Sequence, residues 1–354
     1  MRVHRAIATL IGLLFLVNLG AAQSFMLNLP RQSQHAVVSQ RIGITDVTIN
    51  YHRPLVNKRQ VFGGLVPYGQ VWRAGANENT TITFTDPVTI EGKALDKGTY
   101  GLHMIPGENE WTVIFSKNST SWGSFTYKEA EDALRVTVKP EAADFHEALT
   151  YDFDQPTKDA TVVTLRWEKV AVPFKVGVDT NPIVEASLNK QLRGLAQYNW
   201  ISWDEAANYL LASKVDLDQA LKYEDESIQQ EERFDNLLTR SQILDAMGRK
   251  EEAKAAEGKA LAKANPLQVH MFARGLQGQD RTAEAYDIFR SNAKKNPDKW
   301  FVHSGLARIY SANGDYDNAA KEMKLALAGA PDQQKVYVEG LVKKLESKQD
   351  INKP

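Results

Sequence analysis

The chain has 354 residues, of which 43% are hydrophobic and 25% charged, a length and composition typical of a globular protein of about two domains. Its 43 basic and 44 acidic residues nearly cancel, so the overall charge gives no reason to expect a nucleic-acid partner. The absence of cysteine excludes disulfides, a thiol nucleophile, cysteine-bound metal cofactors and the lipid attachment of a lipoprotein.

The first 22 residues have the pattern of a secretory signal. Arg2 and Arg5 precede an apolar stretch at residues 6–19, and the small residues Gly20 and Ala22 suit a cleavage site. The alternative is a membrane anchor, but the stretch is shorter than the roughly 20 residues that a spanning helix needs. We therefore expect an exported protein, periplasmic or secreted, with no membrane span after cleavage.

The composition changes near residue 180, where the turn-forming segment 178–182 lies. Residues 23–180 contain 17 threonines and 11 alanines, whereas residues 181–354 contain 2 threonines and 24 alanines. Threonine favours strands and alanine favours helices. The sequence therefore predicts a β domain over residues 23–180 and a helical domain over residues 181–354.

Apolar side chains alternate with polar ones in the first domain, which predicts strands with one buried face. The alternation covers residues 47–51, 82–84, 100–104, 111–115, 134–138, 149–153 and 163–167. Turn signals such as Glu91-Gly92 separate these segments. Many short antiparallel strands predict an all-β antiparallel sandwich or an irregular barrel.

The second domain repeats with a period near 34 residues. The clearest unit runs from Pro297 to Pro331, and weaker units precede it. Its pattern of large and small side chains resembles the tetratricopeptide repeat, in which pairs of antiparallel helices stack into a solenoid. The alternative is an ordinary helical bundle, which does not account for the recurring spacing. We expect a tetratricopeptide-like solenoid that binds a protein or peptide partner.

The β domain carries several long motifs in succession: Tyr51-His52-Arg53-Pro54, then residues 59–69, residues 71–78 and Trp111-Thr112-Val113-Ile114-Phe115. Together these motifs resemble the exported bacterial family catalogued as domain of unknown function 2911, over residues 30–176. The resemblance implies an envelope location and a β-rich domain that is sometimes joined to helical repeats. It implies no known activity.

A glycine-rich loop between residues 53 and 78 is the place where binding residues are expected in the β domain. Its arginines suit the binding of a carboxylate, a phosphate or a sugar acid. Alternatively, they fix the conformation of the loop, and we expect hydrogen bonds to fix both Arg53 and Arg73. Trp72 and Trp122 would suit stacking on an envelope glycan if they are exposed; alternatively they are buried for their large apolar area, and we favour burial. The candidate ligand-binding residues are Arg53, Arg73, Glu78, His103 and Trp72.

The sequence contains none of the common catalytic motifs. It has no HExxH pair, no Gly-x-Ser-x-Gly elbow, no P-loop and no dinucleotide fingerprint. We therefore assign no catalytic residue, no metal ligand and no cofactor, and whether the protein is an enzyme stays open, with binding favoured.

In the helical domain, positions that recur after 34 residues are expected to face one concave groove. Arg274 and Arg308 form one such pair, and His270 and Ser304 form another. Stacked guanidinium groups would favour an acidic peptide; alternatively, they pair with acids of the repeats themselves. The sequence thus favours a non-catalytic, exported scaffold, and the alternative is a hydrolase or a protein that binds a small ligand or glycan near residues 53–78.

Overall fold

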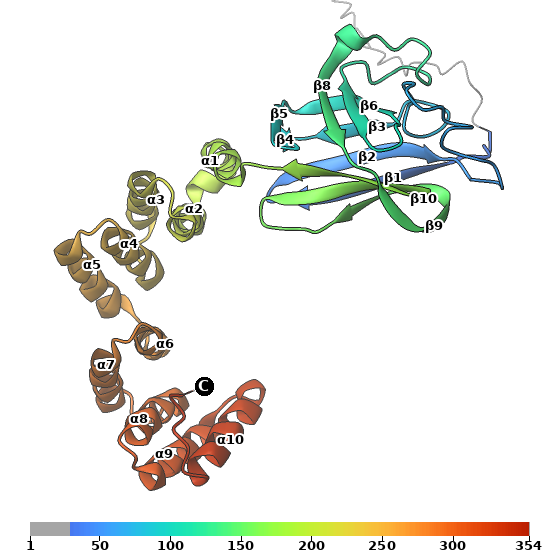
Figure 1. Ribbon diagram of the computed structural model, residues 1–354. Helices are drawn as coiled ribbons and strands as arrows, with labels where there is room; N and C mark the ends of the chain where they lie inside the picture. The colour runs from blue at the N-terminus through green and yellow to red at the C-terminus, as the bar shows by residue number, and fades with distance from the viewer. Residues whose placement is uncertain (1–28, 354) are drawn as a thin grey trace, which may run out of the picture. The chain divides into compact units, whose positions relative to one another are not determined.

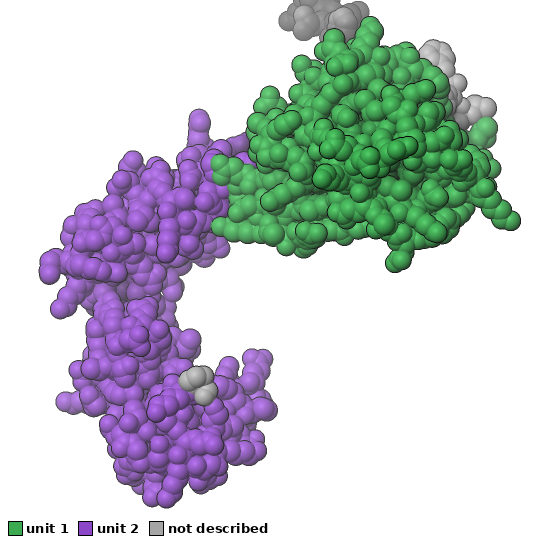
Figure 2. All heavy atoms as spheres, in the orientation of Figure 1, with its two compact units in different colours: residues 1–180 green, residues 181–354 purple. Residues whose placement is uncertain are grey.

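The computed structural model describes residues 29–353 (Figure 1). The predicted signal, residues 1–22, lies outside the described residues. The chain divides into two compact units, residues 1–180 and residues 181–354 (Figure 2).

The first unit contains two antiparallel sheets. The larger sheet has the strand order β1-β2-β3-β6-β7-β8, and the smaller sheet has the order β5-β4-β10-β9. The strands are β1 (Gln34–Ile42), β2 (Thr45–Arg53), β3 (Thr81–Phe84), β4 (Val88–Ile90), β5 (Lys93–Leu95), β6 (Gly98–Ile105), β7 (Trp111–Ser116), β8 (Asp132–Val138), β9 (Glu141–Asp154) and β10 (Ala160–Gly177).

Side chains of the two sheets meet in one core. Phe115 on β7 packs edge-on against Phe174 on β10, with ring centroids 5.9 Å apart, and Tyr51 on β2 packs against Tyr151 on β9 at 4.9 Å. Each predicted strand is present, and most of the predicted apolar positions are buried. The arrangement is a sandwich, which confirms the first of the two predicted all-β folds.

Local sequence explains how the smaller sheet turns and where it ends. Glu91 and Gly92 both have positive φ angles, 48° and 78°, as required of the two central residues of a tight type I′ hairpin between β4 and β5. At the opposite edge of the sheet, β9 carries the exposed acids Glu141 and Asp144 beside the exposed ring of Phe145.

The second unit consists, within the described residues, of ten α-helices that follow one another as antiparallel pairs (Figure 1). This arrangement confirms the predicted tetratricopeptide-like solenoid. The helices are α1 (Thr180–Gln191), α2 (Trp200–Ser213), α3 (Leu217–Gln230), α4 (Phe234–Ala246), α5 (Lys250–Lys263), α6 (Pro266–Gly278), α7 (Thr282–Lys295), α8 (Trp300–Ala312), α9 (Tyr316–Gly329) and α10 (Asp332–Glu346).

The 34-residue period is visible in both turns and packing. Asp280 and Gly314 are 34 residues apart, and both have positive φ angles, 61° and 75°, where α6 and α8 end. Gly305 on α8 allows close packing, because an added Cβ atom would lie 2.8 Å from the ring of Phe289 on α7. Every helix within residues 29–353 falls short, in length or in apolar character, of what crossing a membrane requires.

Candidate functional site

The loop between β2 and β3, residues 54–80, positions the predicted ligand-binding residues of the β domain. The backbones of Trp72 and Met104 exchange two hydrogen bonds of 2.8 Å each, so the loop runs beside β6 at this point. This pairing brings Arg73 near His103, close enough for the two charges to interact. Arg73 and His103, predicted separately from the sequence, therefore belong to one polar cluster.

The Arg73 guanidinium lies in a space that Gly123 leaves open. A Cβ atom added to Gly123 would lie 2.8 Å from Arg73 Nη1. Arg73 Nε is buried without a hydrogen-bond partner, and burial lowers the pKa of this side chain. Arg73 Nε donates no hydrogen bond within the described residues, and the expectation that hydrogen bonds fix Arg73 stays a prediction.

Arg53, in contrast, joins the two sheets. Its Nε donates to the carbonyl oxygen of Leu149 at 2.9 Å, and its Nη2 donates to Thr150 Oγ1 at 2.8 Å. Arg59 donates to two carbonyls of its own loop, at 3.1 and 2.6 Å. Arg53 is therefore fixed by hydrogen bonds, as expected, and the three arginines do not form one guanidinium cluster for a ligand.

His103 is buried beside a second glycine. Its Nδ1 lies 2.9 Å from Ser124 Oγ, and burial lowers its pKa to about 4, so the imidazole is neutral at pH 7. A Cβ atom added to Gly101 would lie 3.3 Å from His103 Nε2 and 2.5 Å from Asn79 Nδ2. The imidazole and the Asn79 amide therefore share the space above Gly101, and Asn79 Oδ1 is buried there without a partner.

Glu78 pairs with a residue that the sequence did not single out. Its Oε1 lies 2.8 Å from Arg31 Nη1. Its Oε2 is 3.4 Å from His52 Nε2, which is within ion-pair distance, but this oxygen accepts no hydrogen bond in the structure. Because burial lowers the pKa of His52, the imidazole is mainly neutral and adds little attraction. Arg31 is thus the main charge partner of Glu78.

The two tryptophans proposed to stack on a sugar occupy different environments. Trp72 stacks on Trp167 inside the sandwich, with ring centroids 5.8 Å apart, and its Nε1 donates to the Gly75 carbonyl at 3.1 Å. Trp122 is 44% exposed, but the Arg31 guanidinium lies 5.4 Å from its ring. The predicted pair of sugar-stacking rings is therefore not present, because one ring packs in the core and the other stacks with Arg31.

A small cavity of about 280 Å³ lies along the same loop. The Nε1 atom of Trp167, one of its lining residues, is buried without a hydrogen-bond partner. None of the described lining residues is acidic. They include Gln32, Ser33, Leu55, Asn57, Arg59, Leu65, Val66, Trp72, Arg73 and Trp167.

The polar cluster offers hydrogen bonds rather than a metal site. Arg73 Nε is an unused donor and Asn79 Oδ1 an unused acceptor, and His103 contributes a neutral ring. In the part of the chain that the structure describes, no group of three or more His, Asp or Glu side chains is placed to hold a metal ion. A ligand that carries oxygen atoms and hydroxyl groups matches these groups.

The predicted groove residues of the helical unit are less accessible than expected. His270, Ser304 and Arg308 are all buried, and burial lowers the pKa of His270 to about 4. Arg274 is partly buried, and its Nη1 donates to Gln277 Oε1 at 2.7 Å. The prediction of two free guanidinium groups that face an acidic peptide is therefore wrong.

A segment near the end of the described chain covers Arg308. Arg308 Nη1 donates to the carbonyl oxygen of Ile351 at 3.1 Å, and its Nη2 donates to Tyr337 Oη at 3.3 Å. The buried Arg308 is only 3% exposed, and burial lowers its pKa to about 10. The sequence pattern placed Arg308 on the correct helix face but gave no sign of the segment that packs over it.

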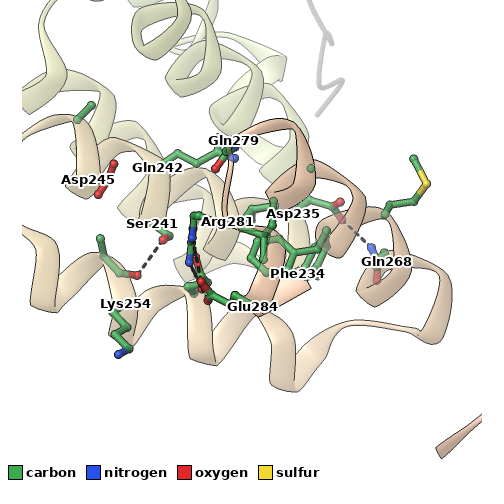
Figure 3. Close-up of a pocket in the computed structure, with 18 of the residues that line it drawn as sticks. Phe234, Asp235, Ser241, Gln242, Asp245, Lys254, Gln268, Gln279, Arg281 and Glu284 are labelled. Carbon is green, nitrogen blue, oxygen red and sulfur yellow. Dashed lines mark hydrogen bonds and ion pairs between the residues drawn. The ribbon is translucent and has the colours of Figure 1, made fainter. Parts of the chain in front are cut away.

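The helical unit contains a cleft of about 1120 Å³ between the pairs α4–α5 and α6–α7 (Figure 3). Its apolar lining includes Phe234, Leu238, Leu267, Met271, Phe272 and Leu276. Charged side chains also line it, and most of them are paired with each other. Arg281 binds Glu284 at 2.8 Å and Glu257 at 3.3 Å, and Lys250 binds Asp245 at 2.6 Å.

Sequence analysis missed this cleft. On α6, Gly275 lines it, and an added Cβ atom would meet nothing within 4 Å. A partial signal was present in the sequence, because Gly275 stands where the next repeat, 34 residues later, has the bulky Ile309.

Comparisons with known proteins separate the two units. Two solved structures match about half of the chain. One is YrrB, a tetratricopeptide-repeat protein with an unusual peptide-binding site, at 15% identity and a TM-score of 0.28, covering 47% of this chain and 87% of that one. The other is the Cut9–Hcn1 hetero-tetramer of APC/C, at 12% identity and a TM-score of 0.32, covering 48% of this chain and 33% of that one. Among curated proteins none matches the chain.

The β domain has a match of a different kind. A family model covers residues 33–176, which extend from the start of β1 almost to the end of β10. The match includes the loop that carries Arg73 and Glu78, and it also includes His103. The family predicted from the sequence motifs is therefore confirmed for this domain: residues 33–176 match the protein family of unknown function DUF2911.

Proposed function

We propose that the protein is a non-catalytic scaffold whose helical unit binds an apolar segment of a partner protein in the cleft between α4–α5 and α6–α7. The observation that supports this proposal most strongly is the cleft itself, an open volume of about 1120 Å³ inside a repeat array. Helical repeats normally bury the faces between neighbouring pairs. Here the cleft leaves apolar surface between two helix pairs, and this surface is available to a partner.

The lining of the cleft favours an apolar occupant. Met271 is 61% exposed and Leu267 is also exposed, although both lie beside the buried Leu276. Burying such side chains contributes about 25 cal/mol per Å² of apolar surface. The paired charges at Arg281 and Lys250 already satisfy each other, so they do not demand a charged ligand.

The test places a photoreactive phenylalanine analogue at position 271 of the full chain. Irradiation in an extract of the source cells should give a discrete covalent adduct with one protein. Met271→Glu, which adds a charge to the apolar surface, should then reduce capture of that same protein by at least about tenfold, since one lost anchor is worth about 1.4 kcal/mol or more.

The matched control is Leu325 on α9, which is 46% exposed and does not line the cleft. Leu325→Glu should not change the adduct that forms at position 271. A photoreactive residue at position 325 should give no adduct. Equal adducts at positions 271 and 325, or none at 271, would contradict a partner site in the cleft.

A second candidate function is supported by the unused polar atoms of the β domain. We infer that Arg73, Asn79 and His103 bind a small ligand that carries an oxyanion and a hydroxyl group. The buried Nε of Arg73 is a donor without an acceptor, which is unfavourable, and an oxygen of an anion would accept its hydrogen bond. A thermal-shift assay compares phosphate, lactate and galacturonate with the neutral sugar galactose. We expect at least one of the acids to raise the melting temperature, and we expect Arg73→Met to abolish that increase. No shift with any acid would contradict this candidate.

We also propose that the protein is exported to the periplasm or secreted, on the basis of the sequence pattern of residues 1–22. The expected mature protein begins at Gln23. Amino-terminal sequencing of protein from the native source tests this directly, and a mature chain that still carried residues 1–22 would contradict the proposal.

A further inference from the structure

Residues 350–353 form a turn that binds the helical unit, and the Lys353 N–H donates to the Asp350 carbonyl oxygen at 3.4 Å across it. Both main-chain groups of Ile351 are bound by side chains of α8. Arg308 Nη1 donates to its carbonyl oxygen at 3.1 Å, and its N–H donates to Ser311 Oγ at 3.0 Å. Because main-chain groups are common to all peptides, these two contacts would hold any segment that adopts the same turn.

The three side chains of this segment are also recognised. Ser311 Oγ donates to Asp350 Oδ1 at 2.8 Å. The side chain of Ile351 is buried in the apolar cluster formed by α8, α9 and α10. Asn352 Nδ2 donates to the Arg308 carbonyl oxygen at 2.9 Å. The segment thus presents an acid, an apolar residue and an amide, and each has a specific partner.

The bound segment joins two neighbouring helix pairs. Gln277 Nε2, at the end of α6, donates to Asn352 Oδ1 at 3.1 Å, whereas Ser311 and Arg308 belong to α8. Two buried atoms beside the segment stay without partners, Arg308 Nε and His270 Nδ1. The internal segment therefore leaves these two nitrogen atoms without hydrogen bonds, and a longer ligand can bind them.

We propose that Gln277, Arg308 and Ser311 form a peptide-binding surface for an Asp–apolar–Asn turn of a partner protein, and that residues 350–352 occupy this surface as an internal competitor. The proposal rests on the proposed scaffold function and names the chemistry of a partner segment. A partner peptide must displace the internal segment, so its apparent affinity falls by the fraction of time that the surface is open.

The test uses a fluorescein-labelled peptide with the sequence of residues 348–354, KQDINKP, as the probe. It is titrated into the full chain and into a chain truncated after Ser347. The truncated chain should bind the peptide, and the full chain should bind it at least about tenfold more weakly. A peptide in which aspartate replaces isoleucine should not bind either chain, because a charge cannot enter the apolar cluster.

Two variants locate the site within the truncated chain. Gln277→Ala removes the amide contact from α6 and should weaken binding about fivefold, the effect of one neutral hydrogen bond. The control, Gln279→Ala, changes an exposed residue that makes no contact with the segment and should bind like the parent. Equal effects of the two changes would overturn the assignment of the surface.

The full-length variant Asp350→Ala/Asn352→Ala keeps Ile351 and provides a test that does not depend on truncation. It loses the side-chain contacts of the segment and should bind the labelled peptide more tightly than the parent chain. The proposal would be overturned if neither this variant nor a truncated chain that is still helical bound the peptide. It would also be overturned if the truncated and full chains bound the peptide equally. Because the cleft is tested separately at position 271, the proposal for one site can be contradicted while the proposal for the other stands.

Discussion

Arg53 and Arg73 lie at the two ends of one connecting segment and have opposite environments. Arg53 donates to the carbonyl oxygen of Leu149 and to Thr150, which lie 96 and 97 residues further along the chain. Arg73 has a buried Nε without a partner. A guanidinium with acceptors stabilises the fold that supplies them, whereas one without acceptors destabilises it.

The matched variants Arg53→Met and Arg73→Met should therefore change stability in opposite directions. Arg53→Met leaves buried acceptors without donors and should lower the free energy of unfolding by about 1–3 kcal/mol. Arg73→Met removes an uncompensated charge and should leave the melting temperature unchanged or raise it. Thermal melts of both variants in phosphate-free buffer check this, and a marked loss of stability in Arg73→Met would show a partner outside the described residues.

Sequence reasoning could identify these arginines but not their environments. Both lie in a glycine-rich loop, and that signal was sufficient to select them. Their partners lie on distant strands, and those contacts depend on how the two sheets pack. The same limit applies to Arg308, whose 34-residue spacing indicated a groove position, while its actual partner, Ile351, lies 43 residues away.

Helix α3 contains a fully buried acid. Glu224 is 0% exposed, and its two carboxyl oxygens have no hydrogen-bond partner. Burial, and then the nearby negative charge of Asp204, raise the pKa of Glu224 to about 9. The folded protein therefore keeps this carboxyl group protonated at pH 7, whereas in the unfolded chain the group ionises near its ordinary pKa of 4.5.

This shift predicts that the helical unit becomes less stable as the pH rises. Above pH 4.5 the unfolded chain loses a proton that the folded chain retains, so stability falls until the pH reaches about 9. The slope approaches about 1.4 kcal/mol per pH unit for one group. Glu224→Gln should make the melting temperature depend less on pH between pH 5 and pH 8, and it should raise the melting temperature at pH 8. The control Glu226→Gln, at an exposed position, should change neither the pH dependence nor the melting temperature.

Two glycines in neighbouring helices allow a direct test of packing. Gly305→Ala on α8 should destabilise the unit, because the new methyl group would lie 2.8 Å from the Phe289 ring. Gly275→Ala on α6 meets open space and should gain about 1 kcal/mol of helix propensity. Chemical denaturation of the two variants gives the comparison, and a shift in the same direction for both would contradict the packing described for α7 and α8.

Elements were easier to predict from sequence than their exact positions. The alternating segments identified seven strands, because alternation reflects one buried face. Strands β1, β4 and β5 were missed. Most side chains of β1 are exposed or half-buried and give little contrast, and β4 and β5 have only three residues each. The repeat pattern gave the helix pairs, yet Gly278 lies inside α6, and the left-handed turn is at Asp280, two residues later.

At the scale of the whole molecule, the change in composition near residue 180 predicted a β sandwich followed by a helical solenoid. Both kinds of fold follow from short-range patterns in the sequence, which are the alternation of apolar residues and the 34-residue repeat. The cleft and the bound segment 350–352 do not, because each results from how successive helix pairs stack. Gly275 gives a partial sign of the cleft, but the spacing of the two helix pairs that line it cannot be read from single residues.

The acidic edge strand of the sandwich has a consequence for how copies of the protein behave in solution. Strand β9 is an edge of the smaller sheet. Its residues 147–149 pair with residues 54–56, whereas its first residues carry an exposed aromatic ring, Phe145, which adds to the capacity of this edge for joining another sheet. Glu141 and Asp144 give that edge a negative charge, so two such edges repel each other. Glu141→Gln/Asp144→Asn should increase self-association at neutral pH and low salt, measured by light scattering, whereas the charge-preserving Asp144→Glu should not. Scattering that stayed at the parent level would mean that the backbone of β9 itself resists pairing; an increase would show that two carboxylates keep the protein colloidally stable.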